Sequence, residues 1–292
     1  MSRNASRIGW VESVIILVLC ILALVTAYPF IYVASMSLSD PKAVIELKVW
    51  LWPKGFSLEA YSLIFENSRI WVSYYNTIWY TVVGTALNIF LTLTFAYPLS
   101  RKDFSARGIF MILLAVTMFF NGGLITNFLL IQKLGLYNTR WAIVLPGAMG
   151  AMNVIMARVF FQTSIPDSLT EAAKIDGATD IKILTRIVLP LSLPIISVVA
   201  IFSSVGYWNN YFNAMIYLID KNLQPLQIYL MEVLIQNNVD ITSEYSSFSQ
   251  REELASQLKY CIIMVSIIPI MCFYPILQKY FVKGAMIGAL KE

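Results

Sequence analysis

The sequence predicts an all-helical integral membrane protein, and three observations support that fold class. Hydrophobic residues make up 58% of the 292 residues and charged residues only 13%, whereas soluble domains are roughly 45 to 50% apolar. The mean hydropathy is +0.69. Apolar runs of about 20 residues, the length that an α-helix needs to cross a bilayer, recur along the chain. We therefore expect one transmembrane domain over residues 1–292, with six membrane-spanning helices.

The six expected spans are separated by polar segments or by turns. They lie at residues 11–38, 71–99, 108–131, 141–161, 191–219 and 260–278. The first run follows Arg3 and Arg7, as in a signal peptide. It exceeds the usual h-region of roughly 7 to 15 residues and has no clear A-x-A cleavage site. We therefore interpret it as a span.

Glycine and proline predict irregularities inside two of the spans. The Asn121-Gly122-Gly123 run predicts a break in the third span, followed by a reoriented outer piece whose freed backbone groups must find partners. Pro269 and Pro275 predict a bend in the last span, because each lacks the N–H that a carbonyl one turn earlier would need.

Short charged segments set the expected orientation. The basic turn of Arg101, Lys102 and Arg107 follows the second span and belongs in the cytoplasm by the positive-inside rule. With six spans, the basic tail at residues 279–292 lies on the same side, so both termini are expected to be cytoplasmic. The polar segment at residues 220–257 then faces outside.

One polar and strongly patterned island, residues 165–194, lies between the fourth and fifth spans. Ser168 and Glu171 have the spacing of a capping box, which predicts that a helix starts there. Asp176-Gly177 is a turn pair, and the glycine can take the left-handed conformation that ends a helix.

A second short helix is expected after this turn. Thr179 or Asp180 can cap its start, and it runs to Leu189 before two prolines set its exit. The product is a helix-turn-helix loop at residues 164–189, whose small side chains let another backbone approach closely.

Several kinds of chemistry are excluded by residues that the chain lacks. It has no histidine, so catalysis by histidine and histidine metal sites are excluded. It has no Gly-Lys dipeptide and hence no phosphate-binding loop, so any ATP must be bound by another chain. The net charge of +4 is thinly spread and offers no basic block for nucleic acid. Three cysteines in apolar runs suggest no disulfide framework.

A polar stripe follows one face of the second span. Thr77, Thr81, Thr85, Asn88 and Thr92 recur at steps of three or four residues. The stripe is typical of helix packing, since threonine bonds its own backbone and asparagine joins helices. A wetted pathway is the alternative.

The fourth span holds two polar side chains of interest, Asn153 and Arg158. Asn153 is a candidate for the same pathway. An arginine within a span is a functional candidate, but Arg158 lies two turns before the polar island, where it can extend to the inner surface. Both interpretations of Arg158 stay open.

The fifth span contains an unusual run of amide and aromatic residues. Aromatic rings pack against the C–H face of a sugar while amides bond its hydroxyls, and binding pockets combine such groups; an interfacial aromatic belt is the alternative. Together with the earlier polar positions, the candidate substrate-path residues are Thr81, Asn88, Asn153, Ser203, Tyr207, Trp208 and Asn210.

Three groups of residues in the polar island keep a fixed spacing. They are Glu171-Ala172-Ala173, then Asp176-Gly177-Ala178, then Ile187 with Pro190-Leu191 and Pro194. With this spacing the island resembles the EAA loop of binding-protein-dependent ABC importer permeases. In that family the loop is cytoplasmic and fits a cleft on a separate ATPase subunit. The resemblance implies that Glu171, Ala172, Ala173, Asp176, Gly177 and Ala178 couple this chain to an ATPase.

The resemblance covers nearly the whole chain and is nearest to the six-span, maltose-type carbohydrate permeases. It implies a bacterial inner-membrane complex of this chain, a second homologous permease, two ATPase subunits and an extracytoplasmic sugar-binding protein. ATP and Mg²⁺ would be bound by the ATPase subunits, with no cofactor or metal in this chain, and the substrate would be an oligosaccharide. The Phe119-Phe120-Asn121-Gly122-Gly123 and Pro225-Leu226-Gln227 runs resemble a branch associated with acidic polysaccharide fragments such as alginate or pectin.

Two other classes of protein remain as alternatives. A secondary transporter driven by an ion gradient predicts carboxylates midway through the spans, and the acid nearest to a span, Glu12, lies at the inner edge of the first one. An integral-membrane enzyme needs paired acids, a metal cluster or a Ser-His pair, and the sequence shows none of these. We therefore expect the permease subunit of an ATP-driven oligosaccharide importer, which performs no bond chemistry itself.

Overall fold

The computed structural model describes residues 9–236 and 248–289, and all regular structure in these residues is helical. The helices are α1 (Trp10–Ser37), α2 (Pro41–Ile45), α3 (Glu59–Glu66), α4 (Ser68–Ser100), α5 (Arg107–Phe119), α6 (Gly123–Lys133), α7 (Trp141–Val144), α8 (Ala151–Ser164), α9 (Asp167–Ile175), α10 (Asp180–Ile183), α11 (Leu189–Leu191), α12 (Leu193–Trp208), α13 (Phe212–Tyr217), α14 (Leu226–Gln236) and α15 (Phe248–Ala289). A π-helical segment, η1 (Leu184–Val188), and a 3-10 turn, η2 (Lys221–Leu223), complete the set.

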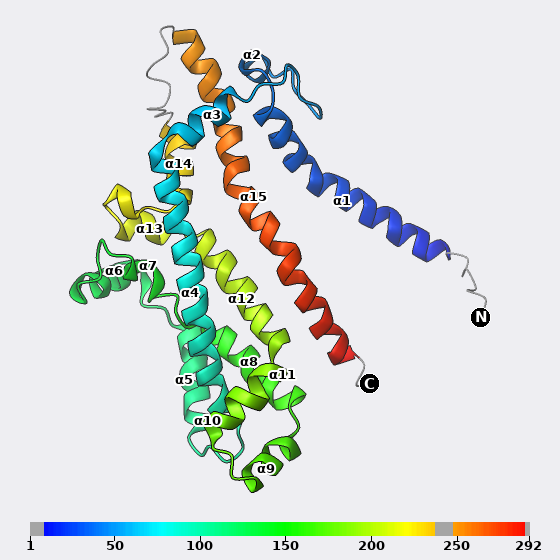
Figure 1. Cartoon of the computed structure of the whole chain (residues 1–292), viewed down its shortest axis with the longest axis vertical. Helices are drawn as coiled ribbons and strands as arrows, with labels where there is room; N and C mark the ends of the chain where they lie inside the picture. The colour runs from blue at the N-terminus through cyan, green and yellow to red at the C-terminus, as the bar shows by residue number, and fades with distance from the viewer. Residues whose placement is uncertain (1–8, 237–247, 290–292) are drawn as a thin grey trace. The chain divides into compact units, whose positions relative to one another are not determined.

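The chain divides into two compact units. The first is Met1–Ser68 with Leu230–Ile267, and the second is Arg69–Tyr229 with Ile268–Glu292. Within the second unit, α9 and α10 lie near the end of α4 at which α5 begins, whereas α13 lies toward the other end of α4 (Figure 1). The candidate functional residues all belong to this second unit.

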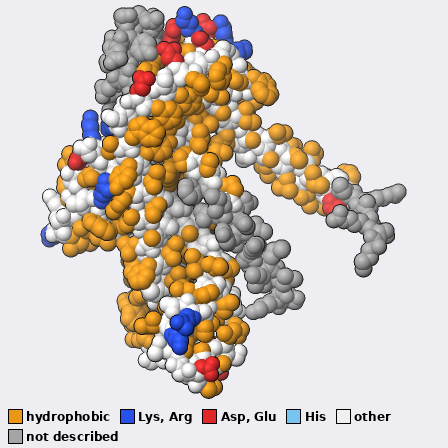
Figure 2. Space-filling model, viewed as in Figure 1, with side chains coloured by type: hydrophobic (Ala, Val, Ile, Leu, Met, Phe, Trp, Pro, Cys, Tyr) orange, Lys and Arg blue, Asp and Glu red, His pale blue; other side chains and the backbone are white. Residues whose placement is uncertain are grey.

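Three helical segments among the described residues are long and apolar enough to cross a membrane. They are Trp10–Ser37, Ser68–Ser100 and Glu253–Cys272, and the number rises to five if each of two bent helix pairs counts as one span. Hydrophobic side chains cover much of the visible surface of α1 (Figure 2), and none of the residues in its most apolar 18-residue window is buried within the described chain. The prediction of an all-helical membrane protein is confirmed, although the segments found are fewer than the six expected.

The break predicted in the third span is present. α5 and α6 meet at 114° across residues 120–122. Gly123 has φ +76°, and its N–H donates to the Asn121 side-chain oxygen at 3.2 Å. A left-handed glycine held by the preceding asparagine therefore redirects the chain, as the sequence run indicated.

The segment expected to form the fourth span, 141–161, is not one continuous helix. The chain forms α7, then an irregular stretch of residues 145–150, then α8. Pro146 cannot donate a backbone hydrogen bond. Distant side chains satisfy two of the exposed carbonyls instead: Tyr207 Oη donates to the Val144 oxygen at 2.9 Å, and Asn88 Nδ2 donates to the Gly147 oxygen at 3.0 Å.

Three other predicted boundaries also differ. The predicted span 191–219 is two helices, α12 and α13, separated near Asn209. The polar segment 220–257 contains η2, α14 and the start of α15 within its described residues. α15 continues through both of its prolines and on to Ala289, well beyond the predicted limits of 260–278. Proline does not end a helix whose freed carbonyls can be satisfied elsewhere.

A buried apolar cluster occupies the end of the second unit at which α9 and α10 lie. It joins residues from α4, α5, α8, α9, α10, η1 and α12, namely Leu93, Ala96, Tyr97, Leu99, Leu114, Val154, Ala157, Phe161, Ile165, Ala173, Ile183, Val188, Ile195 and Val199. The polar island is therefore anchored by a hydrophobic core that includes four of its own side chains, Ile165, Ala173, Ile183 and Val188.

Candidate functional site

The first helix of the helical arm, defined here as residues 166–191, begins two residues earlier than the predicted N-cap at Ser168. The N-cap of α9 is Pro166, and no side chain caps it. The predicted capping box of Ser168 and Glu171 was therefore wrong, because Ser168 already lies inside the first turn. Proline has no N–H to leave unsatisfied, and Asp167 in the first turn is favourable to the helix dipole.

The turn at Gly177 forms as predicted. Gly177 has φ +75°. Its N–H donates to the Lys174 carbonyl at 3.0 Å, and the Ala178 N–H donates to the Ala173 carbonyl at 2.9 Å. This pair of bonds is a Schellman-type ending. Thr179 then caps α10 by accepting from the Lys182 N–H at 3.4 Å, so the two helices of the arm are joined by a hydrogen-bonded turn.

The second half of the arm runs without interruption through α10, η1 and α11. It then bends by 79° into α12 at Ser192. The Ser192 hydroxyl donates to the Val188 carbonyl at 2.6 Å and is fully buried, so it satisfies an acceptor that the bend would otherwise expose. The arm is thus joined directly to the helix that carries Ser203 and Tyr207.

The predicted coupling residues divide between two faces of the arm. Glu171, Ala172, Asp176 and Gly177 are exposed, Ala178 is half-buried, and Ala173 packs into the core. Sequence reasoning missed two exposed apolar side chains beside them, Ile175 at 87% and Ile181 at 75% exposure. Isoleucines on an otherwise polar face were the available signal.

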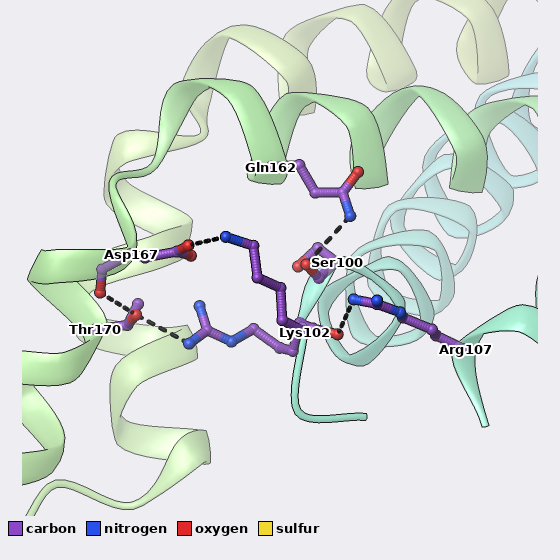
Figure 3. Close-up of polar contacts among 7 residues, drawn as sticks. Ser100, Lys102, Arg107, Gln162, Asp167 and Thr170 are labelled. Atoms are coloured by element: carbon purple, nitrogen blue, oxygen red, sulfur yellow. Dashed lines mark hydrogen bonds and ion pairs between the residues drawn. The ribbon is translucent and has the colours of Figure 1, made fainter. Parts of the chain in front are cut away.

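An ion-pair and hydrogen-bond cluster, here called the arm brace, joins the turn after α4 to α9 (Figure 3). Arg101 Nη2 donates to Thr170 Oγ1 at 2.9 Å, and Lys102 Nζ contacts Asp167 Oδ2 at 2.8 Å. Lys174 Nζ contacts Asp103 Oδ2, also at 2.8 Å.

Charge pairing in the brace shifts three pKa values. The hydrogen bond from Lys102 lowers the pKa of Asp167. The hydrogen bond from Lys174 lowers the pKa of Asp103, and Asp103 in turn raises the pKa of Lys174. All three groups are therefore charged at neutral pH. The sequence had marked Arg101 and Lys102 only as orientation signals.

Arg158 has a structural partner at the same end of the unit. Its Nε donates to the Leu99 carbonyl at 3.0 Å, and Gln162 Nε2 donates to the Ser100 carbonyl at 3.3 Å (Figure 3). These carbonyls belong to the last turn of α4, which has no further helix to bond. The structural interpretation of Arg158 is the one that the geometry supports.

A polar cavity of about 550 Å³ lies between α4, α8 and α12. Five asparagines, two tyrosines and three glycines are among its walls, and no charged side chain of the described residues lines it. The lining residues are Asn88, Gly147, Gly150, Asn153, Phe202, Ser203, Gly206, Tyr207, Asn209, Asn210, Tyr211, Phe212 and Asn213. Five of the seven predicted path residues, Asn88, Asn153, Ser203, Tyr207 and Asn210, are therefore brought together.

Asn88 is the centre of the cavity's hydrogen-bond network. Its Oδ1 accepts from Ser203 Oγ at 2.9 Å, from Asn153 Nδ2 at 3.2 Å and from Thr92 Oγ1 at 3.4 Å. Its Nδ2 donates to the Gly147 carbonyl. One side chain on α4 thus links α8, α12 and the irregular stretch between α7 and α8.

Tyr207 is held against two glycines. A Cβ placed on Gly84 would lie 2.5 Å from Tyr207 Cζ, and one on Gly147 would lie 3.0 Å from Tyr207 Oη. These close approaches require glycine at both positions. The ring position is therefore fixed by shape as well as by the bond to Val144.

The two remaining path candidates, Thr81 and Trp208, lie elsewhere. They line a separate apolar pocket of about 340 Å³ between α4 and α12. Thr77 is buried and accepts from the Leu226 N–H at 2.8 Å, while its own hydroxyl bonds the Ser73 carbonyl. The predicted polar stripe is thus divided: Thr77 serves packing, and Asn88 reaches the cavity.

These features define a membrane transport subunit with a hydrogen-bonded helical arm at one end and a neutral polar cavity. Residues 84–287 match the family described as "Binding-protein-dependent transport system inner membrane component". The chain belongs to this family: it is a multi-pass inner-membrane permease subunit of a binding-protein-dependent ABC importer, a transport component rather than an enzyme.

Two curated relatives and one solved structure resemble it over most of its length. The polygalacturonan/rhamnogalacturonan transport system permease protein YtcP of Bacillus subtilis (strain 168) is 42% identical over 275 residues, which are 94% of this chain and 95% of the relative. Protein LplC of the same organism is 38% identical, covering 91% and 90%. A chain from the crystal structure of a bacterial ABC transporter involved in the import of the acidic polysaccharide alginate matches with TM-score 0.84 and 36% identity, covering 96% of this chain and 99% of that one.

Proposed function

We propose that this permease imports oligosaccharides derived from acidic plant or algal polysaccharides. The relative from Bacillus subtilis is described by its transport of polygalacturonan and rhamnogalacturonan, and the solved structure by import of alginate. The observation in this chain that carries the proposal is the polar cavity, whose amides and aromatic rings suit sugar hydroxyls and ring faces.

The chemistry of the cavity indicates which groups of the sugar this subunit binds. The side-chain amides of Asn210 and Asn213 have no hydrogen-bond partner within the described chain, so they are available to a sugar hydroxyl. Since no described residue of the lining is charged, sugar carboxylates must be neutralised by the second permease. We therefore place the neutral half of the path in this chain.

We further propose that the helical arm docks on the ATPase. Glu171, Ala172 and Gly177 offer a surface with little side-chain bulk, and Ile175 and Ile181 add exposed apolar contacts beside it. The ATPase subunits would bind ATP and Mg²⁺. In this arrangement the arm and both termini are cytoplasmic, the chain spans the membrane six times, and a sugar-binding protein delivers substrate from outside.

The test is uptake by vesicles that contain the purified four-subunit complex and its binding protein. Labelled oligogalacturonates should enter only with internal ATP, and neutral maltooligosaccharides should not. Asn210→Ala with Asn213→Ala should reduce uptake, whereas Asn127→Ala, which removes an exposed amide of α6, should not. Uptake without ATP, or of neutral sugars alone, would overturn the proposal.

A further inference from the structure

The arm brace connects α9 to α4 along one line of contact. Its three anchor positions on α9, Asp167, Thr170 and Lys174, are spaced by three and four residues and therefore share one helix face. Their partners, residues 101–103, follow directly after the last residue of α4. Any displacement of α9 along this face therefore acts on the end of α4.

Arg101 is the best-fixed member of the brace. Its guanidinium bonds Thr170, a fully buried residue whose hydroxyl also donates to the Asp167 carbonyl at 2.7 Å. The same guanidinium lies 6.0 Å from the centre of the Tyr97 ring on α4, and the Arg101 carbonyl accepts from Arg107 Nη1 of α5 at 3.4 Å. Figure 3 shows Thr170 of α9 and Arg107 of α5 bonded to the turn that follows α4.

The two ion pairs are of a different kind. The side chains of Lys102 and Asp167 are 81% and 53% exposed, and those of Lys174 and Asp103 are 41% and 62% exposed. Exposed pairs contribute little to stability and are screened by salt. They orient the loop, while the bond to the buried Thr170 hydroxyl fixes its position.

The brace supplies a second route from the arm to the cavity. By the first route the arm continues through Ser192 into α12, which carries Ser203 and Tyr207. By the second, α4 leads from Ser100, the residue before Arg101, back to Asn88. Asn88 is thirteen residues from Arg101, about 20 Å along a helix that contains Pro98 near its end. Asn88 on α4 and Ser203 on α12 are hydrogen-bonded across the cavity. This bond is kept only if α4 and α12 move together.

We propose that Arg101 is a positioning residue that passes the movement of the arm to α4, so that both walls of the substrate cavity shift in one step. This inference rests on the proposed function of the arm as the ATPase contact. Apolar packing beneath the arm can slide, whereas a hydrogen bond of fixed direction to a buried hydroxyl cannot without breaking. Loss of the bond leaves the first route intact, so ATP is hydrolysed while α12 moves without α4.

Thr170→Val is the cleanest test, because it removes the acceptor oxygen, keeps the volume and lies on the face of the arm turned away from solvent. In vesicles with the full complex, ATPase subunits should copurify as in the wild type. ATP consumed per sugar imported should rise about tenfold, the factor expected from one hydrogen bond to a charged group. Arg101→Ala should raise the ATP cost per sugar as Thr170→Val does. Thr170→Ser keeps the hydroxyl and should keep the coupling that Thr170→Val loses. Thr163→Val changes an exposed threonine of α8 and should have no effect.

The outcomes separate this inference from the proposed function. If the wild-type chain binds no ATPase or imports without ATP, the proposed function fails. If the wild type is coupled but Thr170→Val and Arg101→Ala keep its ATP cost per sugar, only the role of Arg101 fails. Loss of ATPase copurification in Thr170→Val would also overturn it, since the bond would then shape the docking surface.

Discussion

The arm and the cavity use opposite kinds of polar contact. The arm is held by charged side chains, most of them exposed, that join segments 65 to 71 residues apart. The cavity is held by neutral amides and hydroxyls that converge on the buried Asn88. In water, ion pairs orient a surface at little desolvation cost. Inside a membrane, neutral hydrogen bonds give direction without a buried charge.

The largest effect is expected where a neutral contact is replaced by an apolar one. Asn88→Leu leaves Ser203, Asn153 and the Gly147 carbonyl without their shared partner. We expect the free energy of unfolding to fall by about 2 to 4 kcal/mol, and import to stop. Thermal unfolding of the purified complex measures the change, with Asn127→Leu as the control. An unchanged midpoint would show that the network does not hold the cavity together.

A change of shape alone should disturb the cavity nearly as much. Gly84→Ala places a methyl 2.5 Å from Tyr207 Cζ, so the ring must leave its position and its bond to the Val144 carbonyl. We expect import to fall to about a tenth, since a displaced bond of this kind is worth roughly 1.4 kcal/mol. Gly108→Ala, at a position with nothing near the added atom, is the control. Equal import by both variants would mean that the position of Tyr207 is unimportant.

In the arm, a substitution at Gly177 should act through backbone strain alone, with no steric clash. A Cβ on Gly177 meets no atom within 4 Å, but the residue has φ +75°. Gly177→Val should cost about 1 to 3 kcal/mol locally because a β-branched residue is strained there. Membrane insertion should stay normal while import uncouples from ATP hydrolysis. Gly177→Asn, which tolerates this conformation, should keep most of the coupling. Normal sugar uptake by the valine variant would count against the arm as coupling element.

The smallest effect is expected from pH. The lowered pKa of Asp103 means that its pairing stabilises the fold above its ordinary value of 3.8 and is lost as pH falls through the folded value. The raised pKa of Lys174 means that its contribution is present below the ordinary 10.5 and is lost as pH rises through the folded value. ATP consumed per sugar should therefore stay constant from about pH 6 to 9. A step within that range would point to a titrating group outside the brace.

Local features of the sequence predicted local structure well. The Gly177 turn and the break at Gly123 formed because glycine decides the backbone at its own position. The capping box failed for an equally local reason, since Pro166 starts the helix first. Hydropathy does not show that the helix over 141–161 is interrupted after Val144, because the carbonyls of Val144 and Gly147 are satisfied by Tyr207 and Asn88 from distant helices.

For contacts between distant segments, the sequence predicted only which residues share a helix face. Ser203, Tyr207 and Asn210 have helical spacing, so a common lining was foreseen. They do meet in the cavity, although Asn210 lies in the break that follows α12. Trp208, one residue from Tyr207, turns toward the apolar pocket, because successive helical residues point about 100° apart. The pairing of Arg101 with Thr170 had no signal in a single sequence, since nothing local links the two residues.

An amide oxygen has two lone pairs, yet the oxygen of Asn88 faces three donors, at 2.9, 3.2 and 3.4 Å. Two lone pairs cannot serve three donors equally, and the bond from Thr92, at 3.4 Å, is the longest and therefore the weakest of the three. A sugar hydroxyl can therefore replace the weakest donor to Asn88 Oδ1. It can leave again without breaking either of the two shorter bonds. Such exchange favours brief binding of a sugar over tight binding, as a transport path requires.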